Sequence, residues 1–130
     1  RAQRHPGSTA ITPHPLEAAR LLGCDTAAVQ VDRLKAARRL SQQFGCTVVL
    51  NGSGSVIASA EAPALINPTG NSRLATAGTG DVLAGLIGAL QASGMNVVDA
   101  AATAAWRHGH AADEWPADLP LTAGALAAKL

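Results

Sequence analysis

Residues 77–81, AGTGD, lead directly into a long apolar stretch. If that stretch is a helix, its first turn offers unpaired backbone N–H groups and the positive end of the helix dipole, and Gly78 and Gly80 let a phosphate approach the backbone. Asp81 would lie beside that phosphate, where a carboxylate is suited to accept a proton from an attacking hydroxyl. The segment therefore predicts phosphoryl transfer, with Gly78, Thr79 and Gly80 as backbone donors and Asp81 as the base. The alternative is that Thr79 or Asp81 only caps the helix, as these residue types often do.

The composition restricts the classes of protein that are possible. With 130 residues, of which 48% are hydrophobic and 15% charged, the chain has room for one domain, residues 1–130, with a buried core. The net charge of +1 argues against a nucleic-acid partner, and no apolar run approaches the ~20 residues that cross a membrane. Residues 1–9 lack the apolar core of a signal peptide. Cys24 and Cys46 lack metal-site spacing, so we expect no metal centre, two free buried thiols and a cytoplasmic location.

Strand and helix signals alternate along the chain, which predicts an α/β fold. The β-branched run 46–50 is typical of a buried strand, and the apolar stripe of residues 33–44, between Asp32 and Gly45, is typical of a capped helix. The predicted strands are 9–12, 46–50, 55–59 and 64–66, the predicted helices are 16–22, 33–44, 79–93, 98–114 and 122–129, and residues 1–8 form an irregular lead-in. We expect the ligand-facing loops at the strand ends, where such sheets bind ligands.

Three segments resemble the ADP- or ATP-dependent NAD(P)H-hydrate dehydratases, a family with the ribokinase-like fold. These segments are TPHPLEAARLL at 12–22, VLNGSGSVI at 49–57 and NPTGNSRLATAGTGDVLAG at 67–85, in the order and spacing of the family. A looser similarity, AWRHGHAAD at 105–113, matches the helix that follows the glycine-rich loop. The resemblance implies a three-layer α/β/α sandwich of which this chain holds only the C-terminal part, and a first residue other than Met fits that interpretation.

The absence of the N-terminal half has a structural consequence. With about three strands available, the sheet would keep an unprotected edge, which is a site for pairing with another chain. We therefore expect a homo-oligomer or a partner that supplies the other half.

The resemblance implies an enzyme that repairs NADH or NADPH hydrated at C6 of the nicotinamide ring. Phosphorylation of the C6 hydroxyl creates a leaving group, and loss of phosphate restores the cofactor, with ADP or ATP as the phosphoryl donor and Mg²⁺ to counter the phosphate charge. Asp81 matches the residue that takes the hydroxyl proton, and His14 matches a position that contacts the substrate. The residues alone explain His14 equally well as a turn residue held between Pro13 and Pro15.

The loop that holds the AMP portion of the nucleotide in this family corresponds to Asn51, Gly52, Ser53, Gly54 and Ser55, with Gly80 as a further nucleotide contact. Asn51 stands where the family usually has lysine, and we expect weaker nucleotide binding because an amide carries no charge. Leu16 stands where the family usually has glycine. Its side chain either crowds the substrate pocket or points into solvent.

Asn67 and Asn71 are candidates to orient a phosphate, a Mg²⁺-bound water or the substrate. The alternative is that they form Asx turns around Pro68 and Gly70. No residue is assigned as a ligand of Mg²⁺.

The helix predicted at 98–114 carries further polar residues. His108 and His110 lie two positions apart and so face different ways, which argues against a shared metal and makes both polar residues of the surface or core. We expect Arg107 and Asp113 to form a solvated face.

Two other functions are compatible with the sequence. A related small-molecule kinase, acting on a hydroxymethylpyrimidine, thiazole or sugar, would share the glycine loop and its aspartate, although His14 between two prolines favours the dehydratase. A catalytically silent fragment that binds nucleotide or a partner chain is supported by the missing half and by Asn51 and Leu16.

Overall fold

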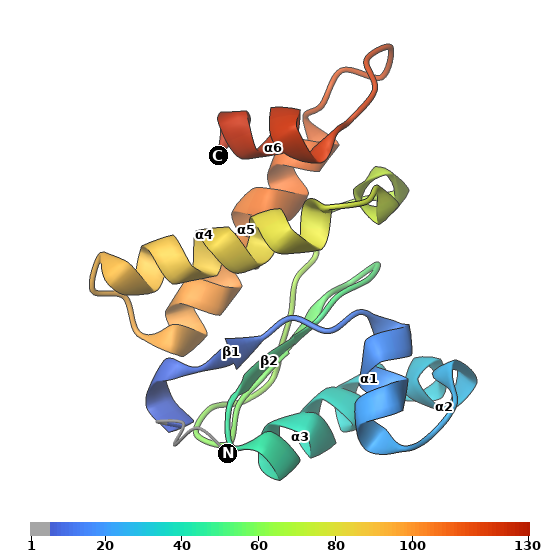
Figure 1. Cartoon of the computed structure of the whole chain (residues 1–130), viewed down its shortest axis with the longest axis vertical. Helices are drawn as coiled ribbons and strands as arrows, with labels where there is room; N and C mark the ends of the chain where they lie inside the picture. The colour runs from blue at the N-terminus through green and yellow to red at the C-terminus, as the bar shows by residue number, and fades with distance from the viewer. Residues whose placement is uncertain (1–5) are drawn as a thin grey trace.

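Four short strands form a mixed sheet at the centre of the molecule (Figure 1). The computed structural model describes residues 6–130, so residues 1–5 of the predicted lead-in lie outside the described part. The strands are β1 (Ala10–Ile11), β2 (Thr47–Leu50), β3 (Val56–Ala58) and β4 (Leu65–Ile66), arranged in the order β1-β2-β3-β4. β1 pairs with β2 in parallel, and the β2–β3 and β3–β4 pairs are antiparallel.

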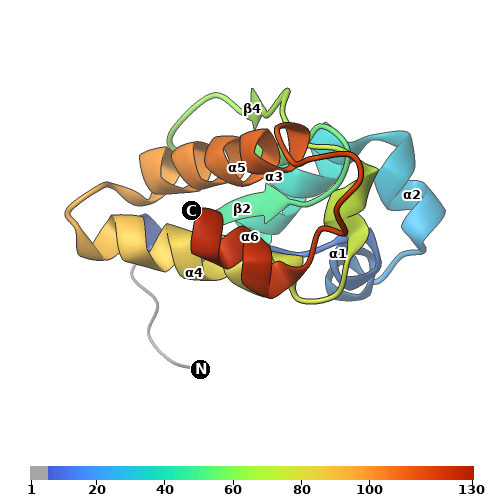
Figure 2. The same ribbon diagram turned by 90° about the horizontal axis from the view of Figure 1, so that it is seen from above.

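Helices cover both faces of the sheet (Figures 1 and 2). The helices are α1 (Pro15–Leu22), α2 (Thr26–Val31), α3 (Arg33–Phe44), α4 (Thr79–Ala92), α5 (Val97–Asp113) and α6 (Ala123–Lys129), with short 3-10 turns η1 (Pro6–Ser8) and η2 (Ser72–Ala75). The α1–α3 group packs on one face of the sheet, and α4 and α5 lie side by side on the other. This is the three-layer α/β/α arrangement that was expected.

Strand β2 is buried on both faces, as its β-branched run predicted. Val48 and Leu50 pack with α1–α3, whereas Val49 between them packs with α4 and α5. This alternation is the two-residue period of a strand, and it fixes the register of the two helical layers against one sheet.

The structure corrects several expectations. α2 was not predicted: it is one short helix whose N-cap is Asp25, and its single buried residue, Val29, leaves little apolar periodicity to detect. Residues 6–8 form the turn η1 instead of an irregular lead-in, and all four strands predicted from the sequence are present in the described sheet, one more than the approximate count used for its open edge. Cys46 is buried as predicted, but Cys24 is exposed because it follows the left-handed Gly23 that ends α1.

The two outer strands of the described sheet each have a single neighbour. β4 is exposed at both residues, unlike the buried β2 and β3. Pairing of these edges with another chain stays a prediction. Within the described residues, no helix has the length and apolar character needed to cross a membrane.

Candidate active site

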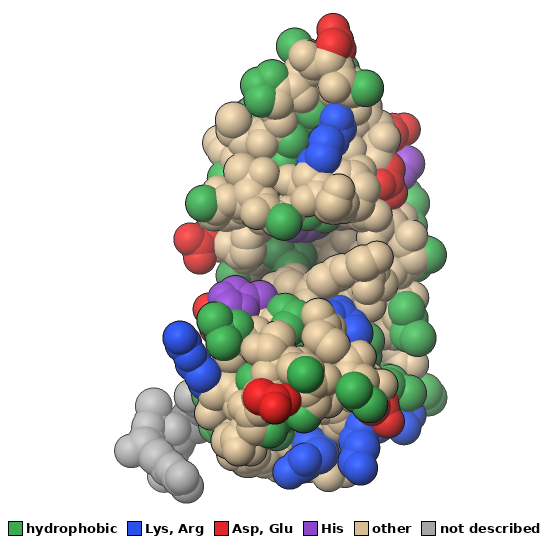
Figure 3. All heavy atoms as spheres, turned by 90° about the vertical axis from the view of Figure 1, so that its right-hand side faces the viewer, with side chains coloured by type: hydrophobic (Ala, Val, Ile, Leu, Met, Phe, Trp, Pro, Cys, Tyr) green, Lys and Arg blue, Asp and Glu red, His purple; other side chains and the backbone are tan. Residues whose placement is uncertain are grey.

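A cleft of about 750 Å³ opens between the end of the sheet and the start of α4, and a hollow crosses this face of the molecule (Figure 3). Two walls enclose it. The strand-end wall is formed by segments 12–17 and 51–55, which follow β1 and β2, and the glycine-loop wall by segment 67–81 with the facing part of α5. Most residues of these segments line the cleft; the exceptions are Pro13, Leu16, Gly54, Pro68 and Arg73. All the predicted site residues line this cleft except Gly54, so the chain brings together segments that are up to about 65 residues apart in sequence.

The start of α4 forms the end of the glycine-loop wall. Gly78 is the N-cap residue, with a left-handed φ of 87°, and no side chain caps the helix. The capping alternative for Thr79 and Asp81 is therefore wrong. The Asp81 side chain lines the cleft from the first turn of α4, and it is free of hydrogen bonds to the described residues. The backbone N–H groups of Gly78 and Gly80 also have no acceptor among the described residues, so they are available to an anion.

Thr79 departs from the expectation. Its N–H donates to the Thr76 carbonyl at 3.3 Å, and its hydroxyl donates to the carbonyls of Leu74 and Thr76. These bonds form because the chain turns tightly into α4, which buries the Thr79 side chain to 5% exposure. Thr79 thus fixes the loop from inside, and two of the three predicted backbone donors remain open.

His108 supports the same turn from α5. Its Nε2 lies 2.8 Å from the Thr79 carbonyl, so that nitrogen carries the proton, as inferred from its partner. Burial lowers the pKa of His108, and the hydrogen bond to Thr79 opposes this in part. His110 faces a different direction, as predicted: it stacks on Trp106 with 4.5 Å between ring centroids and pairs with Glu114.

Asn67 and Asn71 are used within the protein. The Asn67 side chain accepts hydrogen bonds from the N–H and hydroxyl of Thr69 and donates to the Ala105 carbonyl, which is the predicted Asx-turn alternative with an added link to α5. Asn71 accepts from the Arg73 N–H and donates to Asp113. Contacts of either amide with a phosphate or the substrate stay predictions.

Asp113 is not simply part of a solvated face. Although it is exposed, its carboxylate accepts the Gly70 N–H at 2.8 Å and the Asn71 amide at 2.9 Å. The Gly70 N–H is the main cause of the lowered pKa of Asp113, and the Asn71 amide adds to it. Gly109, one helical turn earlier, lets the loop backbone lie directly on α5. Sequence reasoning missed these roles because their partners lie about 40 residues away.

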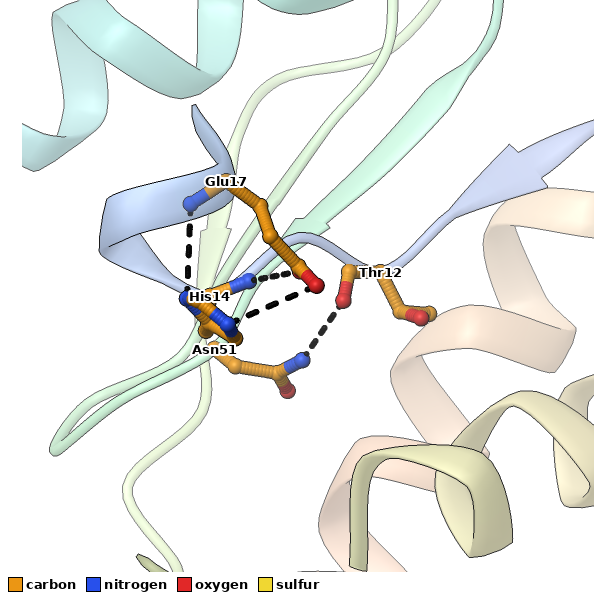
Figure 4. Close-up of polar contacts among 4 residues, drawn as sticks. All are labelled: Thr12, His14, Glu17 and Asn51. Atoms are coloured by element: carbon orange, nitrogen blue, oxygen red, sulfur yellow. Dashed lines mark hydrogen bonds and ion pairs between the residues drawn. The ribbon is translucent and has the colours of Figure 1, made fainter. Parts of the chain in front are cut away.

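His14 anchors the strand-end wall as the N-cap of α1 (Figure 4). Its Nδ1 accepts the Glu17 N–H, the Glu17 carboxylate accepts the His14 N–H, and Nε2 lies 3.4 Å from the same carboxylate. This reciprocal capping box gives His14 a structural role as the N-cap of α1. The imidazole is also half exposed and lines the cleft, so its predicted substrate contact is sterically open.

The hairpin loop after β2 completes the strand-end wall. Asn51 donates its side-chain amide to the Thr12 carbonyl at 2.9 Å, which links the ends of β1 and β2 (Figure 4). Ser55 closes the loop by donating to the Gly52 carbonyl. Leu16 is 46% exposed and absent from the cleft lining. Its side chain therefore points into solvent and does not crowd the substrate pocket.

Glu17 and Thr12 are among the cleft-lining residues that were not predicted as site residues. A signal for Glu17 exists in its position three residues after His14, because a glutamate there is typical of a capping box. Thr12 gives no signal, since it contributes through its backbone carbonyl.

The cleft residues fit Mg²⁺ only as an ion carried by phosphates. The described part of the chain contains no cluster of three or more His, Cys, Asp or Glu residues that could hold a metal. Its two cleft-lining carboxylates, Glu17 and Asp81, lie on opposite walls. Because Mg²⁺ keeps several waters and is commonly bound through substrate phosphates with only one or two carboxylates, the cleft fits an ion that a nucleotide would bring with it.

The chain is similar to known proteins in both sequence and fold. The family described as NAD(P)H-hydrate dehydratase matches residues 2–130. The chain is 49% identical over 120 residues to an ADP-dependent (S)-NAD(P)H-hydrate dehydratase of Neisseria meningitidis, covering 92% of this chain and 40% of that protein. It is 48% identical over 103 residues to a bifunctional NAD(P)H-hydrate repair enzyme of Escherichia coli, covering 79% of this chain and 20% of the relative.

The fold is similar to solved structures of the same type. An ADP/ATP-dependent NAD(P)H-hydrate dehydratase of Bacillus subtilis, co-crystallised with ATP and Mg²⁺, superposes with a TM-score of 0.86 at 32% identity, covering 98% of this chain and 47% of that one. A ribokinase-like superfamily protein of Enterococcus faecalis gives a TM-score of 0.78 at 27% identity, covering 93% of this chain and 42% of that one. The chain therefore spans less than half the length of these relatives, and the expected ribokinase-like fold is confirmed.

Proposed function

The chain belongs to the NAD(P)H-hydrate dehydratase family, and on that basis we propose that it repairs hydrated NADH or NADPH with ADP or ATP as the phosphoryl donor. The relatives named as ADP-dependent and ADP/ATP-dependent support a nucleotide donor. The observation that carries the proposal is the turn into α4, where an open carboxylate, Asp81, adjoins the open N–H groups of Gly78 and Gly80. A phosphoryl group and the hydroxyl that attacks it need this pair of functions side by side.

The reaction is a phosphoryl transfer followed by an elimination. Asp81 accepts the proton of the C6 hydroxyl while the hydroxyl oxygen bonds to the terminal phosphorus of the nucleotide. The bond from that phosphorus to the rest of the nucleotide breaks in the same step. Gly78 and Gly80 donate to the transferring group, and each well-aimed donor is expected to contribute about 3 kcal/mol. The C6–O bond then breaks, phosphate leaves and a proton is lost from C5, which restores the ring of the reduced cofactor. Mg²⁺ bound to the phosphates would neutralise part of their charge.

The strand-end wall is proposed to bind the two ligands. His14 contacts the hydrated nicotinamide from one side of the cleft, and residues 51–55 hold the AMP portion of the nucleotide. We further propose that the chain acts as a single domain, residues 1–130, within a homo-oligomer or with a partner on the open sheet edge.

Substitution of Asp81 tests the role of the base. Asp81→Asn should lower the rate of NADH recovery from its hydrate at least about a hundredfold, because a general base contributes this much or more, while the affinity for ADP or ATP is retained. Asp99→Asn is the matched control, since Asp99 holds the equivalent first-turn position of α5 and lies outside the cleft lining. Unchanged turnover in Asp81→Asn would rule out the assignment.

A second candidate is a chain that binds nucleotide without turnover. One observation favours it: among the described residues no lysine or arginine lines the cleft, so no cationic side chain is placed there to stabilise the charge on a transferring phosphoryl group. Nucleotide binding by the purified chain without NADH recovery, in the presence of Mg²⁺ and either ADP or ATP, would support this candidate over the first.

A further inference from the structure

Arg33 begins α3 but reaches the loop that follows β2. Its Nη2 donates to the carbonyls of Leu50 and Asn51, each at 3.2 Å, and its Nη1 donates to the Gln30 side chain at 3.0 Å. The side chain is half-buried, and the described residues place no carboxylate within ion-pair distance of it. Burial lowers the pKa of Arg33, because removing its guanidinium from water costs free energy. The fold nevertheless keeps this cation behind the loop.

Gly52 shows how closely the guanidinium supports the loop. The residue has a φ of 147°, which disfavours any side chain, and an added Cβ would lie 2.6 Å from both Nη1 and Nη2 of Arg33. The guanidinium therefore occupies the side of Gly52 that faces away from the cleft, while Gly52 itself lines the cleft.

The bond from Arg33 to the Asn51 carbonyl also fixes the direction of the Gly52 N–H. In a planar trans peptide the C=O and the following N–H point in opposite directions. Because Arg33 binds the Asn51 carbonyl, the Gly52 N–H of the same peptide points away from Arg33, and no described residue accepts a hydrogen bond from it. The neighbouring peptide shows the same logic: Arg33 binds the Leu50 carbonyl, and the Asn51 N–H donates to Pro13 on the opposite side.

We propose that Arg33 is a positioning residue for nucleotide binding: it holds the Asn51–Gly52 peptide so that the Gly52 N–H donates to a phosphate in the cleft, and it supplies positive potential from behind the loop. The inference rests on the proposed function. It also accounts for a cleft that is built for phosphates although no lysine or arginine lines it in the described part of the chain.

The test compares Arg33→Met with Arg38→Met, a substitution of an exposed arginine on the same helix. The dissociation constant of ADP and of ATP is measured by calorimetry, and the hydrogen exchange of residues 51–55 is measured without ligand. Arg33→Met should weaken both affinities about tenfold or more and speed exchange in the loop, because a charge-assisted hydrogen bond and its backbone alignment are lost. Arg38→Met should behave as the wild type.

A second variant keeps the test decisive if Arg33→Met fails to fold. Arg33→Lys retains the charge but cannot bind two carbonyls through a planar fork, so its affinity should fall between those of the wild type and Arg33→Met. Wild-type affinity in Arg33→Met, with or without faster loop exchange, would overturn the inference. A wild-type chain that binds neither nucleotide would instead overturn the proposed function, together with this role.

Discussion

The two walls of the cleft are held in place by different kinds of interaction. In the strand-end wall, His14 and Glu17 bond to each other three residues apart, and Ser55 bonds to Gly52 within its own loop. In the glycine-loop wall, the bonds from His108 to the Thr79 carbonyl and from the Gly70 N–H to Asp113 join residues 29 and 43 positions apart. Each segment of the strand-end wall is therefore closed by local bonds, and Asn51 joins the two segments through its bonds to Thr12 and Pro13. The glycine-loop wall depends on the packing of α5.

The two walls also differ in the proposed functions of their residues, which are binding in one wall and catalysis in the other. The strand-end wall carries the proposed nucleotide and substrate contacts, and its segments are closed by their own bonds, so damage there should change affinity more than stability. The wall that depends on α5 carries Asp81 and the open N–H groups, so damage there should change stability and turnover together. Variants in the two walls test this division.

The largest effect is expected from Gly109→Ala. The added Cβ would lie 2.7 Å from the Thr69 carbonyl carbon and 2.8 Å from the Gly70 nitrogen, and backbone atoms cannot move aside as the end of a side chain can. We expect the free energy of unfolding in urea to fall by about 2–3 kcal/mol, the cost of overpacking. Gly88→Ala is the control, because Gly88 lies in α4 with open space around it and alanine is expected to stabilise a helix by about 0.5–1 kcal/mol. Equal effects of the two substitutions would contradict the close contact of α5 with the loop.

His108 should make stability depend on pH. Because burial lowers its pKa in the folded chain below the ordinary 6.5, the unfolded chain takes up a proton first as the pH falls. The contribution of His108 is thus complete above about pH 6.5 and declines below it. We expect His108→Gln to cost about 1 kcal/mol at pH 7.5 and to flatten the stability curve between pH 7 and pH 5.

His110→Gln is the matched control for His108. It removes a second histidine from α5 that bonds only to Glu114 and stacks on Trp106. Its stability curve should keep the wild-type slope. A wild-type curve that is flat from pH 7 to pH 5 would show that His108 does not have this role.

Asp113→Asn should weaken the glycine-loop wall by a smaller amount. The asparagine keeps one acceptor but loses the second hydrogen bond, so at pH 7 we expect a loss of about 1 kcal/mol after allowing for the exposure of the carboxylate. The lowered pKa of Asp113 means that its contribution is present above the ordinary value of 3.8 and is lost as the pH falls through the lower, folded value. Acid unfolding monitored by circular dichroism should therefore be less steep below pH 4 in Asp113→Asn than in Asp118→Asn, which alters an exposed aspartate of the following loop.

Local signals predicted the segments of the strand-end wall and most of the fold, but not the contacts that join those segments. The bounds of α3 were predicted to the residue because Asp32 caps its start and the left-handed Gly45 ends it. Other helices shifted by one residue at an end, and α2 was missed because six residues give too short a period. The carbonyl contacts of Arg33 could not be predicted, since nothing in the sequence says which strand end α3 approaches.

The glycine-loop wall shows more clearly which contacts cannot be predicted from the sequence. The anion site proposed at its turn was predicted from glycine and helix-start chemistry, which is local. Its support was not: Asp113 was predicted to be solvated, and its acceptor role depends on Gly70 arriving at the end of α5. Contacts between residues some 40 positions apart are set by tertiary packing, on which a single sequence carries no direct signal.

The smallest effect is expected where the chain departs from its family in the strand-end wall. Asn51→Lys restores the usual lysine beside the proposed phosphate site but loses the bond to Thr12, so ADP affinity should rise only about three- to tenfold and become more sensitive to salt. Leu16→Gly also restores a family residue, yet it should leave the affinity unchanged because Leu16 points into solvent. If both substitutions changed ADP affinity equally, the cleft assignment of the two positions would be wrong. The double variant Asn51→Lys with Arg33→Met separates the two effects proposed for Arg33. A lysine at position 51 adds positive charge but does not bind the carbonyl of residue 51. If it restored the ADP affinity lost in Arg33→Met, the main contribution of Arg33 would be its charge and not the orientation of the Gly52 N–H.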